Sequence, residues 1–304
     1  MIATTGFFDG VHLGHRLVIE RLVSLARERG DESLVVTFWP HPRAVLQDGA
    51  RELRLLNTLD EKKELLRGLG VDRVEVLDFT RSFAALTAGQ YLREVLHGRF
   101  GVTTLLMGYD NRLGSDRLTA ASLKPVAEEM GVELMELSPL SRPKPQSSLS
   151  FRPSEARGEI SSTQIRTALE NGDIASAEKM LGYAYSLKGA VVAGNRLGRT
   201  IGFPTANMKL YEPLKLVPGR GVYAVDVEVL GRKFRGMTNI GTRPTVGGLS
   251  TSIETHILDF DEDIYGLPLR ITFLRRLRNE IHFPSLEALK SQLEKDREAC
   301  RQHF

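Results

Sequence analysis

The sequence predicts an α/β protein with two domains, a parallel sheet flanked by helices and then a small antiparallel β-barrel with a closing helix. Up to residue 137, short strand-like segments alternate with longer helical patterns, which is typical of a parallel sheet with right-handed crossovers. From Tyr183 the period changes, and strand-like segments follow one another across glycine-rich turns. We therefore expect one domain over residues 1–182 and a second over residues 183–304.

Composition limits the classes of protein to consider. The 304 residues suffice for two domains of ordinary size. Lysine and arginine number 41 against 38 acidic residues, a balance that does not indicate a nucleic-acid partner. Cys300 is the single cysteine, which excludes an intramolecular disulfide and fits a reducing compartment. No apolar run has the length of a membrane span, so we expect a cytoplasmic protein without a membrane partner, whose oligomeric state stays open.

The N-terminal domain is organised around the stretch from Thr5 to His15 (TGFFDGVHLGH). Residues 1–3 predict a strand that runs into this glycine-punctuated turn, and a helix is predicted from Leu13. The apolar positions of that helix recur at helical spacing: Leu17, Leu22, Leu25 and Ala26. A strand, a glycine turn and a helix start together predict an anion site, because the first helical amides lack internal partners.

His12 and His15 are three residues apart at this helix start, so both imidazoles can face one bound anion. Gly10 and Gly14 let the backbone approach a ligand closely. Taken alone, H-x-G-H is short enough to arise by chance. Its position between a strand and an amphipathic helix favours phosphate binding.

Further strands and helices alternate after this element. Strands are predicted at residues 33–38, 73–77, 103–107 and 132–137, and helices at residues 60–69, 88–97 and 120–130. In a parallel sheet, ligands bind beyond the carboxyl ends of the strands, which brings the loop 108–112 towards the His12 turn. His41, just after a strand and beside two prolines, is interpreted as a loop residue rather than a ligand.

Residues 138–158 have no periodicity and are rich in proline and serine, which predicts a mobile loop. A helix follows from Ile160 to about Leu169, and a last short helix covers residues 173–181. The hydroxyl residues at the first helix start are ordinary caps by themselves. Together with Arg166 they also form a candidate second phosphate site.

The C-terminal domain is predicted to contain five strands and a final helix. The strands are residues 185–193, 222–230, 233–240, 252–259 and 269–273. From the residues alone, Pro204 to Asn207 would be a turn. The final helix covers residues 285–301, with Leu286, Leu289 and Leu293 along one face.

Two signatures carry a family resemblance. Residues 6–15 (GFFDGVHLGH) and 160–166 (ISSTQIR) together resemble the motif pair of the nucleotidyltransferase superfamily. Residues 198–207 (GRTIGFPTAN) resemble the signature of riboflavin kinases, with further matches at residues 239–245, 254–260 and 265–266. In this order, and over nearly the whole chain, the motifs resemble the bacterial-type bifunctional riboflavin kinases/FMN adenylyltransferases.

This resemblance implies two reactions that use ATP. A Rossmann-like nucleotidyltransferase sheet would transfer AMP from ATP to the phosphate of FMN, which yields FAD and pyrophosphate. The barrel would transfer phosphate from ATP to riboflavin, which yields FMN. Riboflavin, FMN, FAD and ATP are therefore the implied partners, and Mg²⁺ is the implied cofactor.

The resemblance also implies roles for individual residues. The implied catalytic residues are His12, His15, Arg166 and Glu254. The implied ATP contacts are Gly6, Phe7, Asp9, Gly10, His12, His15, Ser162, Thr163 and Arg166 in the first domain, and Gly202, Thr205 and Asn207 in the second. The implied flavin contacts are Asp110, Asn239, Arg243 and Glu254. Thr205 and Asn207, two apart in an extended segment, offer neutral oxygen ligands to Mg²⁺.

One loop departs from the family pattern. Relatives usually carry aromatic residues in a G-x-x-F-x-F-G segment, where this chain has Asn111 and Leu113. This departure concerns the nucleotide or flavin contacts of the loop, not the reaction.

The two implied nucleophiles, the FMN phosphate and the riboflavin hydroxyl, need different kinds of catalysis. The phosphate of FMN is already anionic at neutral pH, since its second pKa is about 6, so adenylyl transfer needs charge stabilisation. The riboflavin hydroxyl, with a pKa near the value of about 16 for water, gains from a general base. The resemblance assigns that base to Glu254, whereas a lone strand glutamate is otherwise typical of a solvated face.

Three alternatives stay open at this point. The barrel could be a flavin-binding or regulatory module without kinase activity, but Thr205, Asn207 and Glu254 are all present. The first domain could adenylylate or cytidylylate another phosphate ester, because H-x-G-H does not name the acceptor. A nucleic-acid-binding protein is the weakest alternative, since the basic residues form no run.

Overall fold

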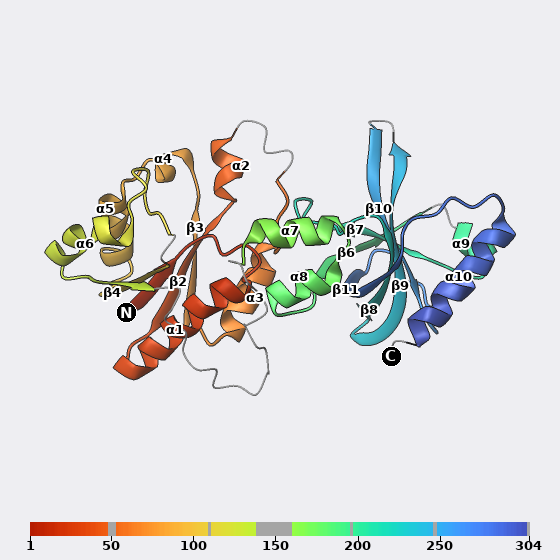
Figure 1. Cartoon of the computed structure of the whole chain (residues 1–304), viewed down its shortest axis with the longest axis horizontal. Helices are drawn as coiled ribbons and strands as arrows, with labels where there is room; N and C mark the ends of the chain where they lie inside the picture. The colour runs from red at the N-terminus through yellow and green to blue at the C-terminus, as the bar shows by residue number, and fades with distance from the viewer. Residues whose placement is uncertain (48–52, 109–110, 138–159, 195–196, 246–247, 303–304) are drawn as a thin grey trace. The chain divides into compact units, whose positions relative to one another are not determined.

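Five parallel strands form the sheet of the N-terminal part, with β1 at its centre (Figure 1). The computed structural model describes residues 1–47, 53–108, 111–137, 160–194, 197–245 and 248–302. The strands are β1 (Ile2–Thr5), β2 (Ser33–Trp39), β3 (Arg73–Asp78), β4 (Thr104–Gly108) and β5 (Glu133–Leu137). Their order is β3-β2-β1-β4-β5, so the predicted parallel sheet is confirmed.

Helices cover both faces of this sheet. They are α1 (Leu13–Arg29), α2 (Pro42–Leu46), α3 (Leu59–Gly68), α4 (Arg81–Ala84), α5 (Ala88–Gln90), the π-helix η2 (Tyr91–His97) and α6 (Ala120–Glu129). One apolar core lies under α1 and α3 and includes Ile19, Leu22 and Leu66. The other lies under α5, η2 and α6 and includes Leu92 and Leu123. β1 is therefore buried on both faces, as a central parallel strand requires.

Two details of this part differ from the sequence-based prediction. Leu17, which was predicted on the buried face of α1, is 44% exposed, and Ile19 and Val23 occupy that face instead. The helix predicted over residues 88–97 is mostly π-helical, and the amide of Gly98 donates to the carbonyl of Arg93, five residues earlier. Simple apolar periodicity does not distinguish this wider helix from an α-helix.

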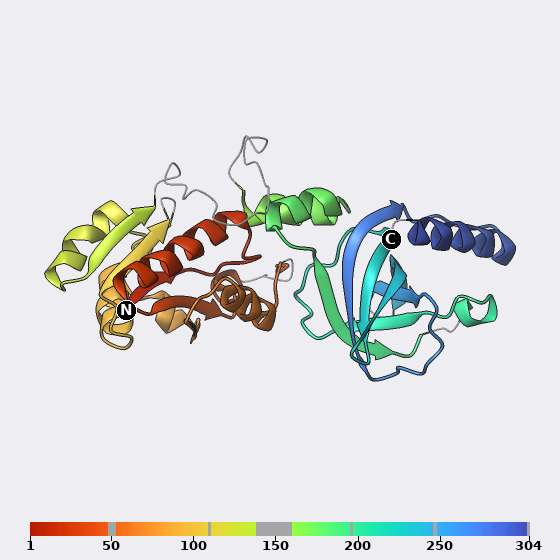
Figure 2. The same cartoon turned by 90° about the horizontal axis from the view of Figure 1, so that it is seen from below.

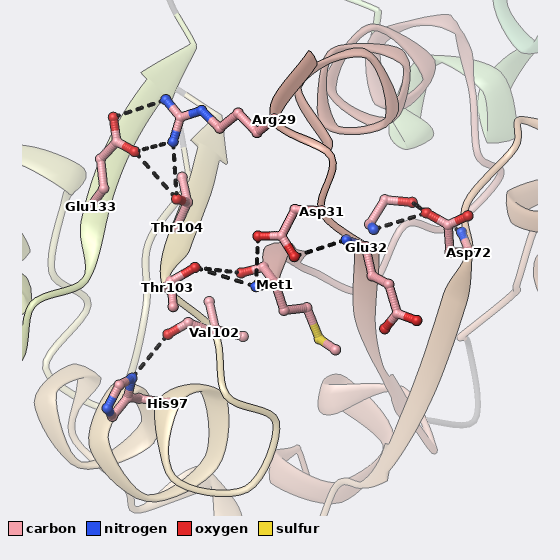
Figure 3. Close-up of polar contacts among 11 residues, drawn as sticks. Met1, Arg29, Asp31, Glu32, Asp72, His97, Val102, Thr103, Thr104 and Glu133 are labelled. Carbon is pink, nitrogen blue, oxygen red and sulfur yellow. Dashed lines mark hydrogen bonds and ion pairs between the residues drawn. The ribbon is translucent and has the colours of Figure 1, made fainter. Parts of the chain in front are cut away.

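Polar contacts fasten the amino ends of the strands (Figure 3). Arg29, in the last turn of α1, pairs with Glu133 at the start of β5, and Thr104 Oγ1 donates to the same carboxylate at 3.2 Å. Ser33 and Asp72 bond reciprocally, with the Ser33 hydroxyl 2.6 Å from Asp72 Oδ2. These contacts hold the C-terminal end of α1 at this edge, so its N-terminus is presented at the opposite edge.

Six antiparallel strands close into a barrel in the C-terminal part (Figure 1). They are β6 (Ser186–Val192), β7 (Ala206–Leu210), β8 (Gly221–Val229), β9 (Arg232–Thr245), β10 (Gly248–Ile257) and β11 (Pro268–Arg278). Ile240 and Ile253 face each other across β9 and β10 and are both buried, and Thr238 and Thr255 share a buried hydrogen bond of 2.8 Å. The predicted barrel is confirmed, but with one strand more than predicted.

The additional strand is β7, which follows Pro204 and contains Asn207. Both residue types favour turns, and the strand is only five residues long, so no alternating pattern identified it. The predicted mobile loop 138–158 lies outside the described residues.

The closing helix α10 (Leu286–Arg301) contacts β9 and β11 and is the dark-blue helix beside the barrel in Figure 2. The prediction that Leu286 belongs to its buried face is wrong, because Leu286 is 48% exposed. Asp296 and Cys300 are buried instead, and Arg278 Nε donates to both carboxylate oxygens of Asp296, at 3.0 and 2.9 Å. The helix is thus held by a buried ion pair as well as by apolar packing.

The chain divides into two compact units, Met1–Ser161 and Ser162–Phe304. Helices α7 (Ser162–Glu170) and α8 (Ile174–Leu181) belong to the second unit, together with the short α9 (Leu197–Thr200). The amide of Gly219 donates to the Leu169 carbonyl at 2.8 Å, and Arg276 donates to the Asn171 carbonyl at 3.0 Å. The boundary between residues 182 and 183 stays a prediction, and these bonds allow it to be tested.

We expect the fragment 162–304 to unfold at a higher temperature than the fragment 183–304. The shorter fragment loses the carbonyl acceptors of Gly219 and Arg276 and exposes apolar surface that α8 covers. Thermal unfolding followed by circular dichroism measures the difference. Equal midpoints would mean that α7 and α8 do not belong energetically to the barrel.

Candidate active sites

The turn between β1 and α1 has an unusual backbone. Phe8 and Val11 lie in the left-handed region, with φ of 52° and 35°, and Gly10 has φ of 87°. This conformation is costly for a branched residue such as valine, and it persists because Phe8 and Val11 are buried in the core under α1. The strained residues of this turn directly precede His12, which begins the helix.

His12 is the N-cap of α1 and is itself only 5% exposed. Its Nδ1 accepts the backbone N–H of His15 at 3.4 Å, so the neutral ring carries its proton on Nε2. The two imidazoles stack with centroids 3.7 Å apart and planes 19° apart. A Cβ on Gly14 would lie 3.2 Å from the His12 ring, which explains the glycine between the histidines.

His15 has a neutral imidazole at neutral pH. Burial lowers its pKa well below the ordinary value, and the nearby His12 and Lys62 lower the pKa further. Its Nδ1 is buried and has no hydrogen-bond partner among the described residues. An imidazole with an unpaired buried nitrogen beside a helix N-terminus is suited to contact a polar ligand.

Other predicted residues of the first site make packing contacts and hydrogen bonds around the turn. Asp9 is buried, and its Oδ1 accepts the backbone N–H groups of Leu56 at 3.0 Å and of Asn57 at 3.4 Å. The Phe7 ring lies edge-on to His41, with centroids 4.2 Å apart, and Gly6 packs against the Phe8 ring. Asp9 therefore fastens the segment before α3 to the turn.

Sequence reasoning missed Lys62, which lies on α3 beside this turn. It is completely buried, and its Nζ lies 3.5 Å from the centroid of the Phe7 ring. The helix pattern DEKKELLRGL indicated only an amphipathic surface helix. No signal in one sequence separates this lysine from the adjacent Lys63.

The loop after β4 reaches the same edge of the sheet. Asn111, which replaces a family aromatic, donates from Nδ2 to the Thr5 carbonyl at 3.1 Å. Leu113, the second replacement, is buried in the core under η2 and α6. Asp110 lies outside the described residues. The replacements therefore attach the loop to the end of β1 and to the core.

The I-S-S-T-x-I-R segment begins beside the histidine turn, because a Cβ on Gly14 would lie 3.6 Å from the Ile160 carbonyl. Ser162, Thr163 and Arg166 follow in the first turns of α7, which belongs to the second unit. Their approach to His12 and His15 is a prediction that the proposal below includes.

The second site is a row of polar residues on the barrel. Strand register places Asn207 opposite Glu254 across β7 and β10, and Glu254 opposite Asn239 across β10 and β9. Directly opposed residues project to the same face, and the residues flanking Glu254, Ile253 and Thr255, are buried in the barrel. The three polar residues therefore share the outer face. Arg243 lies in β9, and its side chain is outside the described part.

The segment before β7 packs against this row. His256, two residues after Glu254, donates from Nδ1 to the Pro204 carbonyl at 2.9 Å and packs against Phe203. Gly202 has φ of 83°, which favours glycine there. A Cβ on Gly194 would lie 2.3 Å from the Asn207 amide nitrogen, so the backbone passes directly over that side chain.

The donor set at Thr205 and Asn207 fits Mg²⁺. Both side chains offer oxygen, the ligand type this ion prefers, and Asn207 is only 8% exposed. No cluster of three or more histidine, cysteine or acidic residues suited to a metal occurs among the described residues, so phosphate oxygens would supply most of the charge.

In the part of the chain that the structure describes, no helix has the length and hydropathy to cross a membrane.

Two family models match the chain. The FAD synthetase model matches residues 1–150, and the riboflavin kinase model matches residues 181–304. The fold and the two sites thus define a class, a nucleotidyltransferase sheet followed by a kinase barrel.

Individual relatives match along the whole length. The bifunctional riboflavin kinase/FMN adenylyltransferase of Escherichia coli K12 is 38% identical, over 100% of this chain and 92% of that protein. The enzyme of the same name from Bacillus subtilis is 34% identical over the same shares. A crystal structure described as a macrolide-efflux protein from Streptococcus pneumoniae has a TM-score of 0.87 and 33% identity, over 99% of this chain and 93% of that one. The chain belongs to the family of bifunctional riboflavin kinases/FMN adenylyltransferases.

Proposed function

We propose that this chain makes both flavin cofactors, FMN from riboflavin on the barrel and FAD from FMN on the parallel-sheet unit. ATP is the co-substrate of both reactions. The observation that carries the proposal is the His12–His15 stack at the start of α1, on a chain whose barrel also aligns Asn207, Glu254 and Asn239. The free buried Cys300 fits a reducing compartment, and we propose the cytoplasm.

In adenylyl transfer, an oxygen of the FMN phosphate attacks the α-phosphorus of ATP, and pyrophosphate leaves. Both partners are anionic, so the site must offset their repulsion and stabilise the charge on the α-phosphate. His12 donates from Nε2, and the first amides of α1 supply further donors. Helix α7 adds the guanidinium of Arg166 and the hydroxyls of Ser162 and Thr163. The wall of the ATP site is formed by Gly6, Phe7, Asp9 and Gly10.

In the kinase reaction, the 5′-hydroxyl of riboflavin attacks the γ-phosphorus of ATP, and ADP leaves. Glu254 projects from the same face as Asn207, a proposed ligand of Mg²⁺, and is therefore placed to accept the proton of the hydroxyl. In this reaction the flavin is oriented from β9 by Asn239 and Arg243, and the turn at Gly202 contacts the ATP. In the other unit, Asp110 orients the FMN. Mg²⁺, held by Thr205 and Asn207, would neutralise charge on the ATP phosphates when bound.

The direct test is incubation of the protein with riboflavin, ATP and Mg²⁺, followed by chromatographic separation of the flavins. We expect FMN to appear first and FAD to follow, because the second reaction consumes the product of the first. FMN without FAD would contradict the role of the first unit. Neither product from riboflavin, with FAD formed from added FMN, would favour a barrel without kinase activity.

We expect Glu254→Gln to lower the rate of FMN formation by roughly 10²–10⁴-fold, the usual contribution of a positioned base. Glutamine keeps the shape of the side chain and removes its basicity. FAD formation from supplied FMN is the internal control and should stay near the wild-type rate. A kinase rate within a few-fold of wild type would show that Glu254 only orients the substrate, and a fall in both rates would indicate misfolding.

A further inference from the structure

Lys62 is a buried cation next to the adenylyl-transfer site. The N-cap of α3, Thr58, forms a reciprocal capping box with Glu61, which fixes the first turn of the helix. Lys62 follows at the next position, and its side chain is completely buried. Its ammonium points under the turn that carries the H-x-G-H motif.

The contacts of Lys62 connect it to this turn. Its Nζ lies 3.5 Å from the centroid of the Phe7 ring and 3.4 Å from Thr37 Oγ1. The Thr37 hydroxyl in turn donates to the Phe7 carbonyl at 3.1 Å. Lys62 thus contacts both the side chain and, through Thr37, the backbone of a residue five positions before His12.

The Lys62 ammonium lies near one carboxylate, that of Asp9, which favours its charged form without forming an ion pair with it. No carboxylate forms an ion pair with its ammonium among the described residues, and a hydroxyl and an aromatic face are weak substitutes for one. Asp9, from the turn after β1, raises the pKa of Lys62, and Lys62 in turn lowers the pKa of His15, from α1. The Oδ1 of Asp9 is already engaged by two backbone N–H groups.

We propose that Lys62 is a positioning residue of the adenylyl-transfer reaction, a buried cation whose counter-charge is the phosphate of the bound substrate. It acts through Phe7 and Thr37 on the turn, and through its electric field on the phosphates, rather than by direct contact. A buried charge has a long reach because the interior screens it weakly. The inference rests on the proposed FAD-forming activity of the first unit.

Protonation of Lys62 is therefore coupled to phosphate binding. Burial lowers the pKa of Lys62 from 10.5 to about 7, and Asp9 opposes that shift. In the free protein above neutral pH, a large share of Lys62 is neutral. An arriving phosphate favours the ammonium, so binding takes up a proton.

Calorimetric titration at pH 8, in two buffers with different ionisation enthalpies, measures this uptake. The matched variants are Lys62→Met and, as the control on the same helix, Lys63→Met. We expect proton uptake in the wild type and in Lys63→Met, and a loss of that uptake in Lys62→Met. Separate titrations with ATP and with FMN identify which phosphate is the counter-charge, and protons taken up at the barrel contribute equally to all three proteins. Uptake that persists in Lys62→Met overturns the proposal.

Stability distinguishes positioning from a structural role. The folded-state pKa lies below the unfolded value, so the unfolded chain binds more protons between about pH 7 and 10.5, and the free energy of unfolding rises with pH in this window. Lys62→Met lacks this rise. It should be at least as stable as the wild type at pH 7, because an unpaired buried ammonium is removed.

Kinetics complete the test. We expect Lys62→Met to form FAD from FMN about 10–100-fold more slowly, the range that losing an outer partner of a metal ligand typically costs in other sites. FMN formation and the Lys63→Met rates should match the wild type. A rate of FAD formation within twofold of the wild type, or a Lys62→Met protein that is unstable and slow in both reactions, overturns the positioning role. If the wild type itself makes no FAD, the proposed function fails instead.

Discussion

The backbone path from β1 into α1 is the constraint on which the first site depends. Two residues with side chains, Phe8 and Val11, adopt left-handed backbone conformations so that His12 can cap the helix and stack on His15. The burial of both side chains offsets this strain. At the other end of the same helix, Arg29 pairs with Glu133, which attaches the last turn of α1 to β5. The sheet thus presents a helix N-terminus, and the strained turn places two imidazoles on it.

The candidate site on the barrel is built by strand pairing rather than by a strained turn. Its polar row arises from strand register alone, because Asn207, Glu254 and Asn239 are direct neighbours across three strands. A one-residue slip in either pairing would turn Glu254 into the barrel interior. In the reactions that we propose, the first site concentrates donors on an anion, whereas the second presents a carboxylate to an alcohol. This difference follows from the acidity of the two nucleophiles rather than from the folds.

Much of this architecture follows from the sequence, and the exceptions have physical reasons. Strand and helix order was predictable because apolar period changes are strong signals. β7 was missed because Pro204 before it and Asn207 within it favour turns. Asp296 was missed because a buried acid contradicts apolar patterning until Arg278 is placed beside it. Lys62 was missed for the same reason, since a lysine in a polar helix predicts a solvated face. The π-helical η2 shares the apolar spacing of an α-helix within its short length.

We propose that the stacked histidines stabilise the transition state of adenylyl transfer rather than bind ATP in its ground state. The steady-state rate of FAD formation by His15→Ala tests this role, with His97→Ala as the control, since the His97 ring bonds to the Val102 carbonyl rather than to the histidine turn (Figure 3). We expect kcat to fall by roughly 10²–10³-fold in His15→Ala, the usual loss for one preorganised donor, with KM for ATP nearly unchanged. An increase confined to KM would contradict the claim.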